Sequence, residues 1–327
     1  MRRADRRRTR SPDERAVYER ARQARRGGQA RAIAASYDAL GEHARAAELR
    51  QCGRLPVYVC AGDGGCGAAH ARAAFHCRDR LCPYCATLRG WRLAERVAPL
   101  VAAMRRPLFL TLTVRNGPEL RERGMHLRRC FGKLRRRVAW RAAVAGGIYV
   151  EEITRNERAG TWHPHAHLIV DSALPPRALE ALVRALWAAI TGDSFVVDAR
   201  PLDPADLREA CKYTAKLGAI VGVPALVGEF LDYARGRRLV IPFGSCYGAD
   251  AALAGAEGEG GELVAADVLA RPCPSCGQVG TLAHDPGRRW DRAAVAAIGG
   301  GWYARCATVA EWRAVLAARA GPGPPAA

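Results

Sequence analysis

The middle of the chain alternates apolar and polar residues in a way that predicts three neighbouring β-strands. Residues 108–114 read Leu-Phe-Leu-Thr-Leu-Thr-Val and stop at the turn sequence Asn116-Gly117-Pro118. Residues 147–154 and 162–170 are further β-rich segments, and a short loop containing asparagine and glycine joins them. A connection of this length predicts a hairpin, so we expect these two strands to be antiparallel neighbours.

Amphipathic segments around these strands predict helices. The order then becomes strand, helix, strand, strand, helix, strand, helix, which most simply gives an antiparallel sheet with helices on one face. This is an α+β fold of the ferredoxin-like kind. The further expected elements are helices over 88–104, 119–140 and 177–190, a helix that opens at Asp203-Pro204 and carries Arg208 to Leu217, and strands over 195–200 and 237–243.

The charge of the chain predicts nucleic acid as the partner. Lysine and arginine number 51 against 32 acidic residues, a formal net charge of +19, as expected of a protein that neutralises phosphates. Charge alone does not separate an enzyme from a structural binder. No apolar stretch approaches the roughly 20 residues that span a bilayer, and the arginine-rich N-terminus lacks the apolar region of a secretion signal. We therefore expect a cytoplasmic protein that does not bind membranes.

The cysteines predict metal sites. The chain has 12 cysteines and no secretion signal, which favours thiols and metal over disulfides. Cys82-Pro-Tyr-Cys85 is a Cys-x2-Cys knuckle of the kind that wraps a tetrahedral Zn²⁺ ion, and four thiolates would close a structural site. His70 and His76 are reserve ligands. We expect four of five cysteines to bind this Zn²⁺: Cys60, Cys66, Cys77, Cys82 and Cys85.

Cys273 and Cys276 form a second knuckle, which predicts a second Zn²⁺ site with ligands that the sequence leaves open. The candidates for its remaining ligands are Cys246, His284 and Cys306. Three isolated cysteines are most simply buried small apolar residues, namely Cys52, Cys130 and Cys211.

Three histidines within five residues, His163-Pro-His165-Ala-His167, predict a second kind of metal site. Strand side chains alternate between faces, so His165 and His167 can bind one ion together. Glu151 and Glu152 on the neighbouring strand point to opposite faces, and one of them can add a carboxylate. Such a ligand set with open water positions suits Mg²⁺ or Mn²⁺ poised to take a phosphate oxygen. His163 is favoured as a supporting or DNA-contacting residue.

Three polar residues share one face of the expected helix that carries Arg208 to Leu217. Glu209, Tyr213 and Lys216 stand at i, i+4 and i+7 and share one helix face. A phenol with a pKa of about 10 needs a nearby cation and a metal to act as a nucleophile on a phosphate. The chain has only three lysines, and Lys212 and Lys216 flank Tyr213. The alternative is a structural role, with Tyr213 in the core and Glu209 paired with Lys212.

These motifs together resemble those of a known family. Phe109–Thr113 with Asn116, then the three histidines, then Glu209-x3-Tyr213-x2-Lys216, are similar in order and spacing to the motifs of HUH endonucleases, specifically the rolling-circle replication initiators (Rep proteins) of plasmids. The similarity covers about residues 75–245. It implies a metal-dependent tyrosine nucleophile that nicks one DNA strand at the origin, stays joined to the 5′ phosphate and leaves a 3′ hydroxyl.

The resemblance also implies roles for individual residues. Tyr213 would attack, Glu209 would activate water for the terminating cleavage, and Lys216 would steady the phenolate or phosphate. Glu-Ile-Thr-x-Asn from Glu152 onward favours that residue over Glu151 as third ligand of Mg²⁺ or Mn²⁺, with His165 and His167. Contacts with DNA are expected from Lys212, Thr111, Thr113, Asn116 and His163. The expected partners are single-stranded and origin duplex DNA, host helicase and host polymerase.

Two related enzyme classes and one non-enzymatic class are alternatives. Relaxases share the histidine pair, but their tyrosine precedes it. Rolling-circle transposases share the cysteine-rich segment, but typically carry a second tyrosine one turn from the first, where this chain has Glu209. A non-catalytic zinc-ribbon protein that binds DNA is the third alternative.

The expected organisation comprises six segments. The cysteine-rich zinc-binding segment precedes the HUH endonuclease domain, and the arginine-rich start, for which the family offers no counterpart, is a basic arm. The segments are a partly disordered basic arm over 1–50, the zinc-binding segment and helix over 51–104, the endonuclease domain over 105–248, a linker over 249–265, a small accessory segment with the second knuckle over 266–318, and a disordered tail over 319–327.

Overall fold

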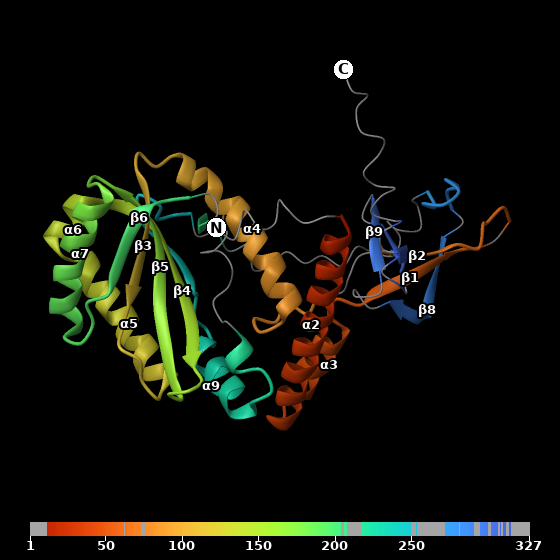
Figure 1. Cartoon of the computed structure of the whole chain (residues 1–327), viewed down its shortest axis with the longest axis horizontal. Helices are drawn as coiled ribbons and strands as arrows, with labels where there is room; N and C mark the ends of the chain where they lie inside the picture. The colour runs from red at the N-terminus through yellow and green to blue at the C-terminus, as the bar shows by residue number, and fades with distance from the viewer. Residues whose placement is uncertain are drawn as a thin grey trace, which may run out of the picture. The chain divides into compact units, whose positions relative to one another are not determined.

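In the computed structural model, which describes most of the chain, the chain forms two compact units (Figure 1). The terminal unit combines Met1–Ala34, His43–Tyr84 and Gly260–Ala327, and the central unit combines Ala35–Glu42 and Cys85–Glu259. The described residues are 12–61, 63–72, 76–203, 206–207, 217–249, 253, 272–280, 282–290, 295–299, 302–306, 308, 310–311 and 314.

An antiparallel five-stranded sheet forms the centre of the central unit. Its strand order is β6-β3-β5-β4-β7, and every neighbouring pair is antiparallel. The predicted α+β class and the predicted hairpin of β4 and β5 are therefore confirmed. The strands are β3 (Pro107–Thr113), β4 (Val144–Asn156), β5 (Thr161–Ser172), β6 (Val197–Pro201) and β7 (Val240–Gly244).

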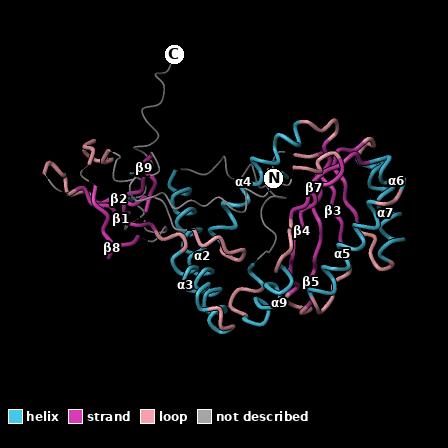
Figure 2. Tube along the Cα trace, turned by 180° about the vertical axis from the view of Figure 1, so that it is seen from behind, coloured by secondary structure: helices cyan, strands magenta, loops and turns pink. Residues whose placement is uncertain are grey.

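Helices cover both faces of this sheet, whereas the sequence predicted helices on one face (Figure 2). Side chains of β3 alternate between the faces: Leu108, Leu110 and Leu112 join the core with α5, α6 and α7, while Phe109 joins a second core with α4. The helix α4 is amphipathic and buries Leu93 and Val97 there. These helices are α4 (Pro83–Ala102), α5 (Leu120–Arg135), α6 (Val138–Ala143) and α7 (Pro176–Thr191).

The predicted helix over 119–140 is two helices in the structure. The α5 helix ends at Arg135, Arg137 takes an extended conformation with φ −69° and ψ 134°, and α6 begins at Val138. The α7 helix ends at Thr191 and is capped by Gly192, whose left-handed φ of 72° suits a glycine. After β6 the chain continues to η1 (Leu217–Ala219) and α9 (Pro224–Ala234), which packs against α5.

The terminal unit contains a second antiparallel sheet built from both ends of the chain. Its strand order is β8-β1-β2-β10-β9. The strands of the predicted small accessory segment over 266–318 pair with N-terminal strands, β8 with β1 and β10 with β2. The strands are β1 (Leu55–Cys60), β2 (Ala69–Arg72), β8 (Leu282–Trp290), β9 (Val295–Gly299) and β10 (Trp302–Arg305).

Residues 12–51 form two helices, although the sequence predicted a partly disordered arm. These are α2 (Pro12–Ala39) and α3 (His43–Gln51). Ile33, Tyr37 and Leu49 are fully buried, and this apolar face stabilises helices that are otherwise rich in arginine. Residues 1–11, most of the linker and the tail lie outside the described residues. In the part of the chain that is described, every helix is too short or too polar to cross a membrane.

Candidate metal centres

Glu152, His165 and His167 converge on one face of the central sheet. The register of β4 and β5 pairs Glu152 with His165, and paired residues point to the same face. Glu152 Oε2 lies 2.8 Å from His165 Nε2 and 2.8 Å from His167 Nε2. One ligand atom from each of the three residues lies within 4.8 Å of the others. Two imidazole nitrogens and a carboxylate oxygen that meet at one point could hold a divalent cation.

The carboxyl group of Glu152 is ionised in this setting. Burial opposes its ionisation, but hydrogen bonds and charge from His165 and His167 outweigh burial and hold the pKa of that carboxyl well below its usual range. A metal ligand must be deprotonated, so Glu152 is ready to bind a cation without first losing a proton.

β3 supplies a support for one histidine. Thr111 pairs with His167 in the sheet, and its Oγ1 lies 3.3 Å from His167 Nδ1. This contact leaves Nε2 turned toward Glu152. The ring of Phe109 packs against the same imidazole with centroids 5.2 Å apart. A partner on the second ring nitrogen fixes the orientation of a metal-binding histidine, and Thr111 is placed to do so.

His163 lies beside this group without belonging to it. Its Nδ1 is hydrogen-bonded to Asn116 Oδ1 at the end of β3, and its ring centroid is 5.1 Å from that of His165. Thr113 pairs with His165 in the sheet, and its hydroxyl donates to the carbonyl of Val196. The predicted DNA contacts that the structure describes therefore border the three ligands.

Glu151 points to the opposite face and is fully buried. Its Oε2 accepts a hydrogen bond of 2.7 Å from Arg128 Nε on α5, and its Oε1 accepts one from the hydroxyl of Tyr233 on α9. Burial raises the pKa of Glu151 in spite of the nearby guanidinium. Its neighbours occupy both of its oxygens, so it is not available as a ligand beside His165 and His167.

A glutamate that the sequence did not single out joins three elements. Glu229 on α9 accepts hydrogen bonds of 2.7 Å from the backbone N–H of Leu120 at the start of α5 and of 2.8 Å from Trp162 Nε1 on β5. Trp162 immediately precedes His163. The signal that could have indicated Glu229 is a carboxylate between apolar residues in the first two turns of the helix, Pro-Ala-Leu-Val-Gly-Glu-Phe-Leu.

The predicted nucleophile helix lies outside the described residues. Glu209, Lys212, Tyr213 and Lys216 all fall in the range 208–216. Asp206 and Leu207 are helical. Of the predicted catalytic residues, the structure therefore describes the three candidate metal ligands and not the candidate nucleophile.

The cysteines form two groups of four, and the five cysteines expected to supply one N-terminal site are divided between them: Cys60 and Cys66 join the knuckle of Cys273 and Cys276. In each group the four sulfur atoms lie within 4.8 Å of one another. The prediction of Cys52 as an isolated apolar residue is wrong, because its sulfur lies 3.3 Å from that of Cys82. Neither group includes five other described residues: Cys130, Cys246, Cys306, His70 and His76. Cys211 lies outside the described residues. The groups are Cys52, Cys77, Cys82 and Cys85, and Cys60, Cys66, Cys273 and Cys276.

The second group joins distant parts of the sequence within the terminal unit. Cys60 Sγ lies 3.7 Å from Cys276 Sγ, and Cys66 Sγ lies 3.8 Å from Cys273 Sγ. A tetrahedral ion with Zn–S bonds of about 2.3 Å would separate its sulfurs by about 3.8 Å. The backbone N–H of Cys66 also donates to Cys60 Sγ at 3.4 Å. The donor atoms and their spacing therefore fit a four-thiolate metal site.

The central unit is thus an α+β domain with a candidate metal site, and comparison with known proteins shows what it is similar to. Residues 68–173, which include Glu152, His165 and His167, match the family of replication proteins. No solved structure matches the chain.

Similar curated proteins carry the name Protein rep. One from Lactiplantibacillus plantarum is 30% identical over 181 residues, which cover 51% of this chain and 55% of that protein. One from Streptococcus pneumoniae is 29% identical over 138 residues, 40% of each chain, and one from a Bacillus species is 30% identical over 153 residues, 45% of this chain and 49% of that protein. The matches span about half of these relatives or less. The resemblance to Rep proteins that the motifs predict is confirmed.

Proposed function

We propose that the chain is a rolling-circle replication initiator that nicks and rejoins single-stranded DNA at a plasmid origin through a covalent 5′-phosphotyrosine. The observation that carries this proposal is the convergence of Glu152, His165 and His167 on one sheet face, inside the segment that matches replication proteins. We also propose that the central sheet is the ferredoxin-like HUH endonuclease fold, a proposal that the order β6-β3-β5-β4-β7 supports.

In the proposed reaction Glu152, His165 and His167 hold Mg²⁺ or Mn²⁺. The ion, when bound, supplies positive charge that polarises the scissile phosphate. The phenolate oxygen of Tyr213 forms a bond to phosphorus, and the 3′ oxygen leaves with its electron pair and gains a proton. The ammonium group of Lys216 stabilises the negative charge of the phenolate or of the phosphate. In the terminating cleavage Glu209 takes a proton from water, the water oxygen bonds to phosphorus and the 3′ oxygen leaves. The new 3′ hydroxyl then bonds to the phosphorus of the phosphotyrosine, and the phenol oxygen of Tyr213 leaves and regains a proton.

The residues around the ligands have supporting roles in this proposal. Thr113 pairs with His165 in the sheet and Asn116 contacts His163, and the proposed role of Thr113, Asn116 and His163 is to contact the strand that is cut. Thr111 reaches His167 directly, so its proposed role is to orient that ligand as well as to contact DNA. Lys212 is proposed to bind a DNA phosphate.

Both cysteine groups are proposed to hold structural Zn²⁺. Four thiolates leave no open coordination position, so neither site would take part in the reaction. In the terminal unit the ion at Cys60, Cys66, Cys273 and Cys276 would cross-link β1 to the segment that precedes β8. Binding to single-stranded and origin duplex DNA, recruitment of host helicase and polymerase, and a cytoplasmic location remain predictions.

A transposase with the same chemistry is the second candidate, and a non-catalytic zinc-ribbon protein is the third. Glutamate at position 209, where transposases typically carry a second tyrosine, favours the initiator. The complete set of three metal ligands favours an enzyme over a protein that only binds DNA.

The test is covalent capture of DNA by the whole protein. The protein is incubated with Mn²⁺ and a labelled single-stranded oligonucleotide that covers the origin, and adducts are separated under denaturing conditions. We expect an adduct with the wild type and with Tyr247→Phe, a control at a tyrosine that is 79% exposed, but none with Tyr213→Phe. An adduct in Tyr213→Phe contradicts the proposed nucleophile. Failure of the wild type to form one supports the non-catalytic alternative.

A further inference from the structure

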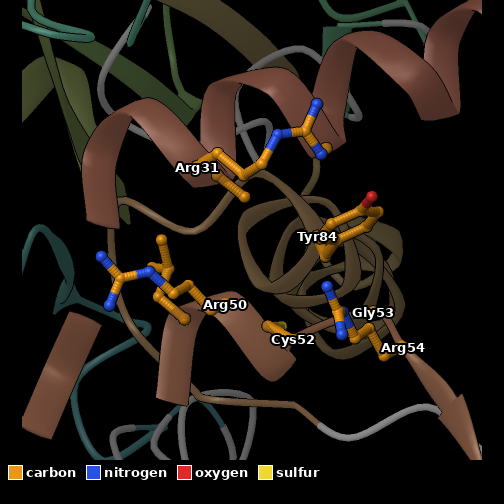
Figure 3. A pocket seen from close by; sticks show the side chains of 9 residues that line it. Arg31, Arg50, Cys52, Gly53, Arg54 and Tyr84 are labelled. Carbon is orange, nitrogen blue, oxygen red and sulfur yellow. The ribbon is translucent and has the colours of Figure 1, made fainter. Parts of the chain in front are cut away.

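A small pocket in the terminal unit has an arginine rim and a buried floor (Figure 3). It lies between α2, α3 and the start of α4 and has a volume of about 230 Å³. Arg31, Arg50 and Arg54 are exposed at its edge, and Tyr84, which also lines the pocket, is only 7% exposed. Among the described residues that line the pocket, none is acidic. The pocket is therefore a concave and strongly positive site.

Two glycines allow the floor of the pocket to form. Gly53 has a left-handed φ of 78°, and a Cβ atom at this position would lie 2.9 Å from Cδ2 of Tyr84. The backbone between α3 and β1 thus rests directly on the phenol ring and holds it in place. A Cβ atom at Gly27 would lie 3.4 Å from both Arg31 Nη1 and Tyr84 Oη. A guanidinium and a phenol hydroxyl therefore approach the same point beside α2.

The chemistry of these groups fits a phosphate. A guanidinium presents a planar set of donors that matches phosphate oxygens, and it stays charged at every physiological pH. In Figure 3 the guanidinium groups of Arg31 and Arg54 lie on opposite sides of Tyr84 in the view. The volume is below the roughly 300 Å³ at which sites for drug-sized ligands begin. It suits one phosphate group with part of its sugar rather than a whole cofactor.

We propose that this pocket binds a phosphodiester of the DNA strand, at a site separate from the metal ligands of the central unit. The formal net charge of +19 makes a polyanion the natural partner. The inference rests on DNA being the substrate, as proposed above, but it does not require that the protein nicks DNA. Because contacts to phosphate position a protein without reading bases, the pocket would add affinity for any sequence.

The test is the salt dependence of DNA binding by the whole protein without Mg²⁺ or Mn²⁺, so that cleavage plays no part. Binding of a fluorescent single-stranded oligonucleotide is measured by anisotropy over a range of NaCl concentrations. For Arg31→Gln/Arg54→Gln we expect weaker binding and a slope of log K against log [NaCl] that is smaller by about 0.7 for each phosphate that the variant no longer neutralises. Tyr84→Phe keeps the ring under Gly53 and should weaken binding while leaving the slope unchanged.

The matched control is Arg289→Gln/Arg305→Gln, which removes the same charge at two exposed arginines of the same unit. The proposal is overturned if the pocket variant and this control lose the same affinity and slope. Inorganic phosphate and a mononucleotide serve as competing probes. If they raise the melting temperature of the wild type alone, while the pocket variant binds DNA like the control, the pocket takes a free phosphate compound and the proposal is wrong. Equal zinc content in all variants shows that they are folded.

Discussion

The hydroxyl of Tyr233 donates a hydrogen bond to Glu151, the residue directly before the metal-binding candidate Glu152. Two adjacent carboxylates on β4 therefore point to opposite faces of the sheet and make different contacts. Glu152 faces the two histidines, while Glu151 anchors the strand to α5 and α9 through Arg128 and Tyr233. Since the buried anchor fixes the backbone of β4 at this point, it also fixes where Glu152 can reach.

The variant Tyr233→Phe should lower the free energy of unfolding by about 1–3 kcal/mol, because it leaves a buried carboxylate oxygen without its donor. Denaturant unfolding of the whole protein measures this. Tyr247→Phe is the control, since Tyr247 is 79% exposed and should change stability little. Equal stability of the two variants would contradict the role assigned to Tyr233.

Two glycines on α5 should respond to alanine in opposite directions. A Cβ atom at Gly124 would lie 2.4 Å from Cζ of Tyr233, so Gly124→Ala forces α9 away and should cost about 1–3 kcal/mol. At Gly132 the nearest atom to such a Cβ is Arg136 Nη1, 3.9 Å away. Gly132→Ala should therefore stabilise the protein by about 0.5–1 kcal/mol. Thermal unfolding of the pair measures both, and a loss of stability in Gly132→Ala would contradict the second expectation.

The purified chain should hold two Zn²⁺ ions, measured by elemental analysis. Cys276→Ser should reduce the content to one ion by removing a ligand of the group that includes Cys60. Cys82→Ser should remove the other ion. Cys130→Ser should keep both, because Cys130 is buried in the central core and belongs to neither group. A single ion in the wild type would show that one group does not bind metal.

The stability of the terminal unit should fall in mild acid because of His70. Burial lowers the pKa of His70 from the usual value of about 6.5, so the unfolded chain binds the proton more readily than the folded one. The free energy of unfolding should therefore decrease as the pH falls below about 6.5, toward the lower pKa of the folded state. His70→Gln, which can still meet Ser275 Oγ, should show a weaker decrease over pH 7.5 to 5.5 in denaturant unfolding. An unchanged pH dependence in this variant would assign the effect to other groups.

Local patterns predicted the central sheet and the site on it. The period-two alternation of β3 and β5 determines which side chains share a face, and this placed His165 and His167 together. The identity of the third ligand did not follow from alternation alone, since Glu151 and Glu152 are equivalent until the register with β5 is known. The structure pairs Glu152 with His165.

Pairings across long stretches of chain could not be predicted in the same way. Cys66 and Cys273 are 207 residues apart, and no local pattern indicates that β8 pairs with β1. The knuckle spacing of Cys82 and Cys85 predicted that these residues bind metal, but not that Cys52 would join them. The two helices over 12–51 were missed because their many arginines conceal an apolar face.

The terminal sheet also sets an order for folding during synthesis. The strands β3 to β7 are encoded within Pro107–Gly244, so the central sheet can form as soon as that stretch has left the ribosome. β1 and β2 are made earlier but must wait for β8 and β10, which come more than 200 residues later. The sheet that contains the first strands to be synthesised, β1 and β2, is therefore the last to be completed. A chain that ends before Cys273 would form the whole central sheet but would lack β8, β9 and β10 of the terminal sheet.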